Sequence, residues 1–330
     1  MATMNAVQIH KFGGPEVLEY STNVPRPKPG PDDVLIRIKA VGVNPVDVVI
    51  RSGQFPFYPP FPIILGIDFT GIVEEVGSNV TDLKVGQRVY GSNLTAPNAM
   101  KAYAEFIAVK QNLVHPLHDK LTFSQGASLP IPYFTAYRAL FTLAQAKPGE
   151  TVFVHGASGG VGIAVVQIAS GLGLTVIGTA STPEGQELAK KAGAHFIFNH
   201  YEEGYLEKVK EAAGKKGIDV IIESIADKNL VKDLGLIRKQ GRIVIVGGAT
   251  EIPLNPVNIF ANEVTVKGVF LYNITDDQLF ETREALYAGA KAGWLNPYIW
   301  KEFPLEKAAD AHTLLKSGAG ARGKIILTAN

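Results

Sequence analysis

The stretch Thr151-Val-Phe-Val-His-Gly-Ala-Ser-Gly-Gly-Val-Gly162 decides the fold of this chain. A compact apolar strand runs into a glycine-rich turn, and the helix predicted over Gly160–Gly173 begins directly after it. In such a turn, Gly159 lets the backbone approach a pyrophosphate, and Gly162 lets the helix pack closely on the strand. Ala157 stands where the usual dinucleotide-binding fingerprint has its first glycine. The order of strand, turn and helix still favours a dinucleotide cofactor over a glycine-rich turn without a ligand.

Around this motif, from about residue 125 onward, compact apolar runs alternate with segments of helix length such as 182–191 and 203–213. This alternation predicts parallel β-α-β units, and hence an α/β fold with a doubly wound sheet covered on both faces. A last helix over about 276–292 and a tail strand over 323–327 are expected to return to the first domain. The predicted strands of the sheet are Thr151–His155, Leu174–Gly178, His195–Phe198, Ile218–Ile222, Gly241–Val246 and Val264–Phe270.

The first third of the chain has a different pattern, in which short β-branched runs are separated by Gly and Pro. The run Val34–Val41 alternates, and 71–76, 87–90 and 104–109 follow it, whereas the proline-rich stretch Pro25–Pro31 is expected to be a loop. Short strands at this spacing predict a twisted antiparallel barrel or sandwich.

Composition limits the kinds of partner. A chain of 330 residues allows about two domains of ordinary size. The net charge is +1, and the lysines are dispersed, which argues against nucleic acid as the primary partner. The longest apolar region, 164–180, is interrupted by polar residues and glycines, and the first residues do not resemble a secretory leader. We therefore expect a cytoplasmic protein that does not span a membrane.

Cysteine is absent, which excludes disulfides, thiolate nucleophiles, iron–sulfur clusters and sulfur-based zinc sites. The histidines do not replace them. His115 and His118 have ligand-like spacing, but Pro116 lies between them and favours a solvated pair. His155 is expected to be a buried imidazole at a strand end. The pair Tyr287 and Lys291 fits the string of short-chain reductases, but it follows all six predicted strands and is interpreted as a chance match.

The form of the cofactor follows from the residues after the second strand of the sheet. NAD-binding sheets usually offer an Asp or Glu to the ribose 2′-hydroxyl here. The stretch 178–182 contains no acid, and the first one is Glu184, inside the next helix. This pattern favours NADPH. Lys and Arg are also missing from 178–183, so a 2′-phosphate would need Ser181, Thr182 and a distant partner, for which His200, Tyr201 and Arg322 are candidates.

Several motifs together resemble the zeta-crystallin type of NADPH:quinone oxidoreductase, in the zinc-free medium-chain dehydrogenase/reductase superfamily. They are Asn44-Pro-Val-Asp47, Leu65-Gly-Ile-Asp-Phe-Thr-Gly71, Ile131–Leu140, Val154–Gly162, Gly193-Ala-His195 and Phe198-Asn-His200. The resemblance extends from about Ala6 to Leu327. It implies a GroES-like barrel domain over 1–127 and 273–330, a Rossmann NADPH-binding domain over 128–272, and a cleft between them.

The resemblance also implies the roles of individual residues. The pyrophosphate would meet Ser158, Gly159, Gly160 and Val161; the adenosine end Ser181, His200 and Asn229; and the nicotinamide Thr135, Val246, Gly247, Gly248, Val269, Phe270 and Leu271. Asn44 and Asp47 would form the cleft floor. Two features depart from the family: Val49 stands where Tyr is frequent, and the loop Tyr90–Ala102 matches weakly.

The chemistry narrows the reaction. In zinc-dependent relatives a Gly-His-Glu motif and cysteines hold the metal, whereas this chain has Gly66-Ile-Asp68 and no cysteine. A quinone accepts a hydride without strong acid catalysis, because its own carbonyls take up the charge. The aromatic run Gln54–Pro62, with Tyr58 as its only hydroxyl, would form a wall of the acceptor site or be a rigid loop packed on the barrel.

Three hypotheses for the function stay open besides quinone reduction. The first is reduction of the double bond of an enone or alkenal, which needs only one modest proton donor, Tyr58 or water. The second and third are a non-catalytic crystallin-like protein and an RNA-binding protein.

The apolar strand Val264–Tyr272 would lie at the edge of the sheet, and such edges usually need covering. We therefore expect a homodimer, with a homotetramer as the second assembly that the resemblance allows.

Overall fold

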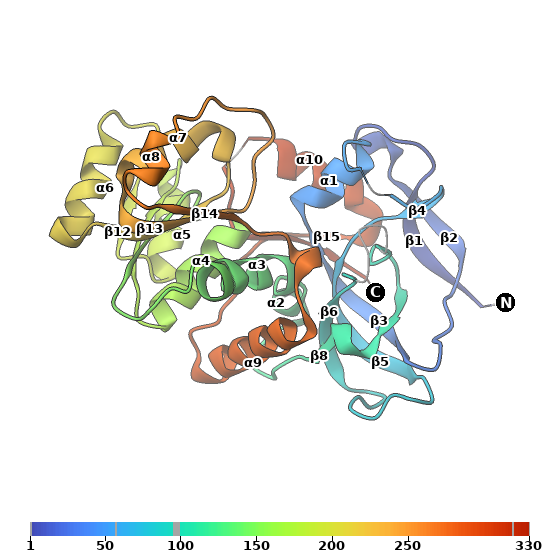
Figure 1. The fold of residues 1–330 in the computed structure, drawn as a ribbon. Helices are drawn as coiled ribbons and strands as arrows, with labels where there is room; N and C mark the ends of the chain where they lie inside the picture. The colour runs from blue at the N-terminus through green and yellow to red at the C-terminus, as the bar shows by residue number, and fades with distance from the viewer. Residues whose placement is uncertain (1, 57, 95–99, 319, 330) are drawn as a thin grey trace. The chain divides into compact units, whose positions relative to one another are not determined.

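The computed structural model describes residues 2–56, 58–94, 100–318 and 320–329. The chain divides into two compact units, and many of their helices and strands are labelled in Figure 1. The first unit comprises Met1–Ile131, Pro297–Ala319 and Lys324–Asn330, and the second comprises Pro132–Asn296 and Gly320–Gly323.

The first unit is a β structure in which, over its described residues, most strand pairs are antiparallel. One sheet has the order β15-β16-β3-β5-β6-β8 with β7 also paired to β3, and a smaller sheet has the order β2-β1-β4. Buried side chains of β3 and β5, such as Ile36, Ile38 and Phe69, form the centre of its core. The strands are β1 (Thr3–Ile9), β2 (Glu19–Pro25), β3 (Asp33–Val43), β4 (Ile63–Ile64), β5 (Asp68–Val76), β6 (Arg88–Ser92), β7 (Phe106–Lys110), β8 (Val114–Pro116), β15 (Ile299–Pro304) and β16 (Lys324–Thr328), and the α-helices are α1 (Pro45–Arg51), α2 (Phe123–Ala127) and α10 (Ala308–Lys316). The predicted antiparallel β domain is confirmed.

The second unit is built on a parallel sheet with the order β11-β10-β9-β12-β13-β14, which is the doubly wound order that the sequence predicts. The strand order reverses between β9 and β12, which creates the switch point at which such sheets bind ligands. The strands are β9 (Thr151–Val154), β10 (Thr175–Thr179), β11 (Phe196–Phe198), β12 (Ile218–Glu223), β13 (Ile237–Ile245) and β14 (Thr265–Gly268). The helices are α3 (Thr135–Tyr137), α4 (Gly160–Gly171), α5 (Pro183–Lys191), α6 (Tyr205–Ala213), α7 (Ala226–Leu236), α8 (Val257–Phe260) and α9 (Asp276–Ala292).

The central strands of this sheet are buried along their whole length. Every residue of β9 and of β12 is buried, as expected for strands covered by helices on both faces. α3 lies within a helical run, 130–143, that continues on both sides as π-helical turns. This run places Thr135 in the second unit, where its side chain is buried.

The C-terminal part of the chain is divided differently from the expectation. The sequence analysis assigns 273–330 to the first domain, but α9 belongs to the second unit. The Tyr137 hydroxyl donates to Glu281 Oε1 at 2.9 Å, and Arg138 donates to Gln278, so polar contacts fix α9 to the helical run. α9 is also not the last helix, since α10 follows it. Only the later segments, β15, α10 and β16, return to the first unit.

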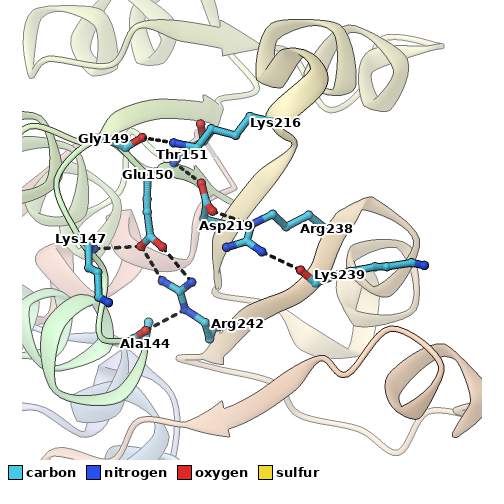
Figure 2. Close-up of polar contacts among 10 residues, drawn as sticks. All are labelled: Ala144, Lys147, Gly149, Glu150, Thr151, Lys216, Asp219, Arg238, Lys239 and Arg242. Carbon is cyan, nitrogen blue, oxygen red and sulfur yellow. Dashed lines mark hydrogen bonds and ion pairs between the residues drawn. The ribbon is translucent and has the colours of Figure 1, made fainter.

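The N-terminal ends of the central strands carry a network of paired charges (Figure 2). Arg242 of β13 contacts both carboxylate oxygens of Glu150, at 3.0 and 2.5 Å. Asp219 of β12 accepts from the Thr151 amide at 2.8 Å and from Arg238 Nε at 2.5 Å. The network joins the starts of β9 and β12 to β13, and the carboxylates of Glu150 and Asp219 both have protein partners.

None of the described helices is both long and apolar enough to cross a lipid bilayer.

Candidate cofactor site and acceptor residues

The glycine-rich turn after β9 has the close packing that a dinucleotide fingerprint requires. A Cβ added at Gly162 would overlap the Gly156 carbonyl oxygen, so only glycine lets α4 begin at this turn. Ala157 is fully buried, and a Cβ added at Gly178 of β10 would lie 2.6 Å from the Ala157 Cβ. The glycine of β10 therefore makes room for the methyl group that replaces the first glycine of the fingerprint.

Helix α4 begins with free backbone donors. Its N-cap is Gly159, and in the described structure no side chain caps the helix start. The first N–H groups of a helix lack intrahelical partners and attract anions. The start of α4 is therefore suited to an anion, and the assignment of Ser158 to Val161 to a pyrophosphate stays a prediction.

A segment from the end of the chain lies on this turn, which the sequence analysis missed. The Gly323 amide donates to the Ser158 carbonyl at 2.6 Å, and Ser158 Oγ donates to the Ala321 carbonyl at 2.7 Å. Gly159 and Gly323 form a parallel bridge. The signal that could have revealed the segment is the run Gly320-Ala-Arg-Gly323 directly before the tail strand, because close backbone approach needs small residues.

The predicted adenosine-end residues fall at two places on the sheet. Ser181 follows β10 and His200 follows β11, and the Ala180 amide donates to the Phe198 carbonyl at 3.0 Å, so these two strand ends are adjacent. Burial lowers the pKa of His200, and nearby His155 lowers it further. Asn229 is on α7, beside the end of β12, where its Nδ2 donates to Glu223 Oε1 at 3.2 Å. The strand ends that precede Ser181 and His200 are thus adjacent, whereas Asn229 follows β12, on the other side of the switch point.

The predicted nicotinamide-end residues come from several elements of the same unit. Val246 to Gly248 follow β13, where the Val246 amide donates to the Glu223 carbonyl at 2.7 Å and the Ala226 amide donates to the Gly247 carbonyl at 2.9 Å. Val269 to Leu271 follow β14, and the Val269 amide donates to the Ile245 carbonyl at 2.9 Å. Because the carboxyl ends of parallel strands meet at one edge, these segments lie at the edge where ligands bind.

A buried cluster of His155, Glu223 and Asp233 lies at the same edge. His155 Nε2 is 2.8 Å from Asp233 Oδ1 and 3.2 Å from Glu223 Oε2, and all three side chains are buried. Burial raises the pKa of Glu223 and that of Asp233 to about 7, and lowers the pKa of His155. In the described part of the chain, this is the one group of three residues with ligand atoms close enough for a metal ion. The expectation for His155 is confirmed, while its two acidic partners were missed.

A second buried cluster surrounds Asn44 in the first unit. Asn44 Nδ2 donates to Asp68 Oδ2 at 3.0 Å and to the Gly42 carbonyl at 3.2 Å, and Asn44 Oδ1 accepts from Lys324 Nζ. The Asn44 amide also donates to Asp47 Oδ2 at 2.8 Å, which closes a capping box on α1. Burial raises the pKa of Asp47 to about 7 and that of Asp68 to about 6, and lowers the pKa of Lys324. Asn44 and Asp47 therefore contact each other, while their place in the acceptor site stays a prediction.

Asp47 also begins a chain of buried hydrogen bonds. Tyr103 donates its hydroxyl to Asp47 Oδ2 at 3.2 Å and lies 2.9 Å from His312 Nε2, while Arg51 Nη1 lies 3.1 Å from His312 Nδ1. Burial lowers the pKa of His312 to about 3. The imidazole is thus neutral, with Nδ1 accepting from Arg51 and Nε2 donating to the Tyr103 oxygen. This network was not predicted, because its members are far apart in the sequence.

The place of the zinc-binding motif does not fit zinc. Asp68 occupies this position. Both of its carboxylate oxygens lie 3.2 Å from the Ile131 amide nitrogen, and Oδ2 lies 3.7 Å from Lys324 Nζ. An ammonium group at this distance already supplies the positive charge. Without any cysteine in the chain, the donor set of the zinc-dependent enzymes is missing.

Tyr58 lies in the predicted acceptor loop and is exposed, unlike the buried Asn44 and Asp47. Its side chain is 47% exposed, and its ring packs edge-on against Phe12 with centroids 4.8 Å apart. Phe61 also packs on the ring of Phe12, with centroids 5.0 Å apart. Phe57 and residues 95–99 of the weakly matching loop lie outside the described residues.

Two expectations about other motifs are tested by the structure. His115 is not solvated: its side chain is buried, and its ring lies 5.4 Å from that of Tyr90, because β8 pairs with β6 at this point. His118 is half-buried, and its Nδ1 accepts from the Lys120 amide. Tyr287 and Lys291 lie on α9, where Tyr287 is 45% exposed.

The chain combines a doubly wound dinucleotide-binding unit with an antiparallel β unit, and both ends of the chain belong to the β unit. This combination defines a medium-chain dehydrogenase/reductase. The comparisons with known proteins agree with this class. Residues 30–119 match the family described as alcohol dehydrogenase GroES-like domain, and residues 160–286 match the family described as zinc-binding dehydrogenase.

Individual relatives define the family more closely. The human protein named quinone oxidoreductase is 46% identical over 324 residues, which cover 98% of this chain and 97% of that protein. The crystal structure of Escherichia coli quinone oxidoreductase complexed with NADPH has a TM-score of 0.87 and 30% identity, covering 98% of this chain and all of that one. A Burkholderia protein named 2-haloacrylate reductase is 34% identical, with 98% of both chains covered. The chain belongs to the quinone oxidoreductase, or zeta-crystallin, family.

Proposed function

We propose that this chain is an NADPH-dependent quinone reductase that works without a metal ion. The observation that carries the proposal is the fingerprint turn, in which Gly162 lets α4 begin against the Gly156 carbonyl and Gly178 makes room for Ala157. A turn packed in this way presents the start of α4 to a dinucleotide. Human and Escherichia coli relatives of nearly the same length, both named quinone oxidoreductase, support the choice of substrate.

The second unit would bind and orient the cofactor, which supplies the hydride. The turn from Ser158 to Val161 would hold the pyrophosphate, and Ser181 and His200 would hold the adenosine end. Asn229 of α7 would also contact the adenosine end. The nicotinamide would be lined by Thr135, Val246 to Gly248 and Val269 to Leu271. Glu223 accepts from the Asn229 side chain and, through its backbone carbonyl, from the Val246 amide, so it holds together the segments that follow β12 and β13.

In the first unit, we propose that Asn44 and Asp47 position the acceptor rather than transfer a proton. Both N–H bonds of the Asn44 side-chain amide and its oxygen already have partners, and Asp47 accepts from Asn44 and Tyr103. Tyr58, by contrast, is exposed, and we propose it as the proton donor of this site. A quinone is a suitable substrate for such residues, because orientation and desolvation are the main contributions that the protein must make.

Steady-state rates with NADPH and a panel of ortho-quinones, para-quinones, enones and alkenals test this function. We expect the acceptor with the highest kcat/KM to be a quinone. A higher kcat/KM for an enone or alkenal than for every quinone would replace the assignment. NADPH binding without turnover of either class would favour the crystallin-like, non-catalytic hypothesis, and RNA binding at physiological salt would favour the RNA-binding one.

Double-bond reduction is the second candidate function. The Burkholderia relative is named for 2-haloacrylate, whose double bond is conjugated to a carboxylate. Val49, which is half-buried in α1, replaces a tyrosine that the family often has and leaves a smaller side chain there. Restoring the ring with Val49→Tyr should lower kcat/KM for large quinones more than for small alkenals.

Assembly and location stay predictions. We propose a homodimer formed through β14, which lies at the edge of the sheet and whose residues are mostly exposed. Light scattering at micromolar and at nanomolar concentration tests it, and a monomer mass at both would contradict it. A cytoplasmic location is proposed from the sequence alone.

A further inference from the structure

We propose that Arg322 selects NADPH over NADH by binding the 2′-phosphate beside Ser181 and Thr182. This inference rests on the proposed function, because it assumes that the second unit binds a nicotinamide dinucleotide. It goes further by naming the positive group that residues 178–183 lack. That group comes from the far end of the chain, more than a hundred residues after the fingerprint.

The segment that carries Arg322 is anchored on the fingerprint turn. The hydrogen bonds of Gly323 and Ala321 to Ser158, at 2.6 and 2.7 Å, hold the backbone on both sides of Arg322. A Cβ added at Gly159 would lie 3.2 Å from the Ala321 Cβ, so the two backbones are in close contact. Arg322 is thus presented by a fixed backbone rather than by a free tail.

The same segment runs beside the residues that follow β10. A Cβ added at Gly320 would lie 3.1 Å from Thr182 Cγ2 and 3.6 Å from Ser181 Oγ. Arg322 Nη2 is 3.5 Å from Glu184 Oε2, and the Arg322 side chain is 29% exposed. The guanidinium therefore lies at the first turn of α5, next to the place where a doubly wound sheet holds the ribose 2′ position.

The remaining candidates for this role lack a positive charge at neutral pH or lie elsewhere. Burial and His155 lower the pKa of His200, which keeps its imidazole neutral. Tyr201 is 79% exposed and carries no charge. Lys190 and Lys191 are in the last turn of α5, at the opposite end of the helix. Thr182 Oγ1 already accepts from the Gly185 amide at 3.1 Å, so the two hydroxyls alone would hold the phosphate weakly.

Glu184 competes with the 2′-phosphate for the guanidinium of Arg322. Without a 2′-phosphate, as with NADH, Arg322 keeps Glu184 as its partner. With NADPH, the phosphate offers a doubly charged acceptor to the guanidinium, which binds such groups through parallel hydrogen bonds. Glu184 then stands near the phosphate as a like charge, and its removal should strengthen NADPH binding.

Dissociation constants of NADPH, NADH and adenosine 2′,5′-bisphosphate, measured by fluorescence and calorimetry, test the inference. Arg322→Ala should weaken NADPH and the bisphosphate by about 10- to 100-fold, the usual range for a lost hydrogen-bonded charge, while NADH changes less than about 2-fold. Arg322→Lys should restore part of the loss. Glu184→Gln should tighten NADPH by about 2- to 5-fold with little effect on NADH.

Lys191→Ala provides the matched control, since it removes an exposed positive charge from α5, the helix that carries Glu184 in its first turn. It should leave all three constants unchanged. If Arg322→Ala weakens NADPH and NADH alike, Arg322 supports the pyrophosphate turn, and the inference is wrong; an unchanged NADPH constant would also overturn it. If the unsubstituted protein binds NADH as tightly as NADPH, the proposed cofactor preference fails instead, which separates the two failures.

Discussion

The two ends of the parallel sheet in the second unit differ in how their acidic side chains are paired. At the N-terminal ends, Glu150 and Asp219 each meet an arginine, Arg242 and Arg238, as Figure 2 shows. At the C-terminal ends, Glu223 and Asp233 share a single imidazole and have pKa values raised to about 7 by burial.

This difference separates a structural edge from a functional one. Paired charges at strand starts hold β9, β12 and β13 in register and need no ligand. The opposite edge instead combines a glycine turn, the start of α4 without a side-chain cap, and buried acidic groups whose pKa values are raised. These features are typical of ligand sites. The predictions below test this comparison, beginning with the largest effect.

The largest effect is expected at the fingerprint turn. Gly162→Ala introduces a Cβ that overlaps the Gly156 carbonyl oxygen, so α4 must move away from the turn. We expect NADPH affinity to fall by about 100-fold, which corresponds to about 3 kcal/mol. The control is Gly235→Ala in α7, where an added Cβ meets nothing within 4 Å. This variant should bind NADPH normally and gain up to about 1 kcal/mol of stability. Equal NADPH affinities in the two variants would contradict the fingerprint assignment.

The next effect concerns the buried acids at the same edge. Because burial raises the pKa of Asp233 to about 7, the folded state holds a proton that the unfolded chain has released. The stability present below about pH 4 is therefore lost as the pH rises to about 7. Asp233→Asn removes this loss, so the variant should gain about 2 to 4 kcal/mol relative to the native protein between these pH values.

The measurement is urea unfolding followed by Trp294, which packs on Gly171 and Gly289 in the second unit. A Trp300→Phe background removes the other tryptophan, which lies in the first unit. A stability difference between the two proteins that does not vary from pH 4 to 7 would show that Asp233 ionises normally.

A smaller effect is expected at the structural edge. Arg242→Met breaks the two-pronged contact with Glu150, whose partners are each less than one-fifth exposed. We expect unfolding of the second unit to become easier by about 1 to 2 kcal/mol, because a hydrogen-bonded charge pair is lost. NADPH affinity should stay within about 2-fold of the native value. If Arg242→Met changed the free energy of NADPH binding by more than the free energy of unfolding, the distinction between the two edges would be wrong.

The smallest effect is expected on the surface. Lys191 and Glu187 form an exposed pair one turn apart on α5, at 3.5 Å. Lys191→Met should change the unfolding free energy by less than about 0.5 kcal/mol, because solvent and salt screen such pairs. A loss comparable to that of Arg242→Met would mean that burial does not explain the difference between the pairs.

The features that the sequence predicted well are those encoded in short stretches. The six strands of the doubly wound sheet, the turn at Gly159 and Gly162, and the antiparallel β domain each leave a local pattern of apolar residues, glycines or alternation. Even the alanine in the fingerprint is explained by a glycine on the adjacent strand, Gly178. Local patterns suffice because the strand and the helix start that form the site are consecutive.

The features that were missed depend on residues far apart in the chain. Asn44 and Lys324 are separated by 280 positions, and nothing near either residue indicates the other. The same holds for Arg322 and Glu184, and for α9, whose attachment to the second unit depends on Tyr137 and Arg138. His115 was expected in solvent because a proline follows it, but pairing of β8 with β6 buries it. Burial and tertiary pairing decide these positions, and a single sequence does not encode them locally.

The central claim is that this chain reduces quinones with NADPH and without a metal ion. The most direct measurement is the rate of NADPH oxidation with and without an ortho-quinone, in protein that has been exhaustively dialysed against a chelator and analysed for zinc. We predict quinone-dependent NADPH oxidation at the undialysed rate with substoichiometric zinc, because Lys324 and Asp68 occupy the place of the metal motif. Loss of the quinone-dependent rate on dialysis, with recovery on addition of zinc, would contradict the account.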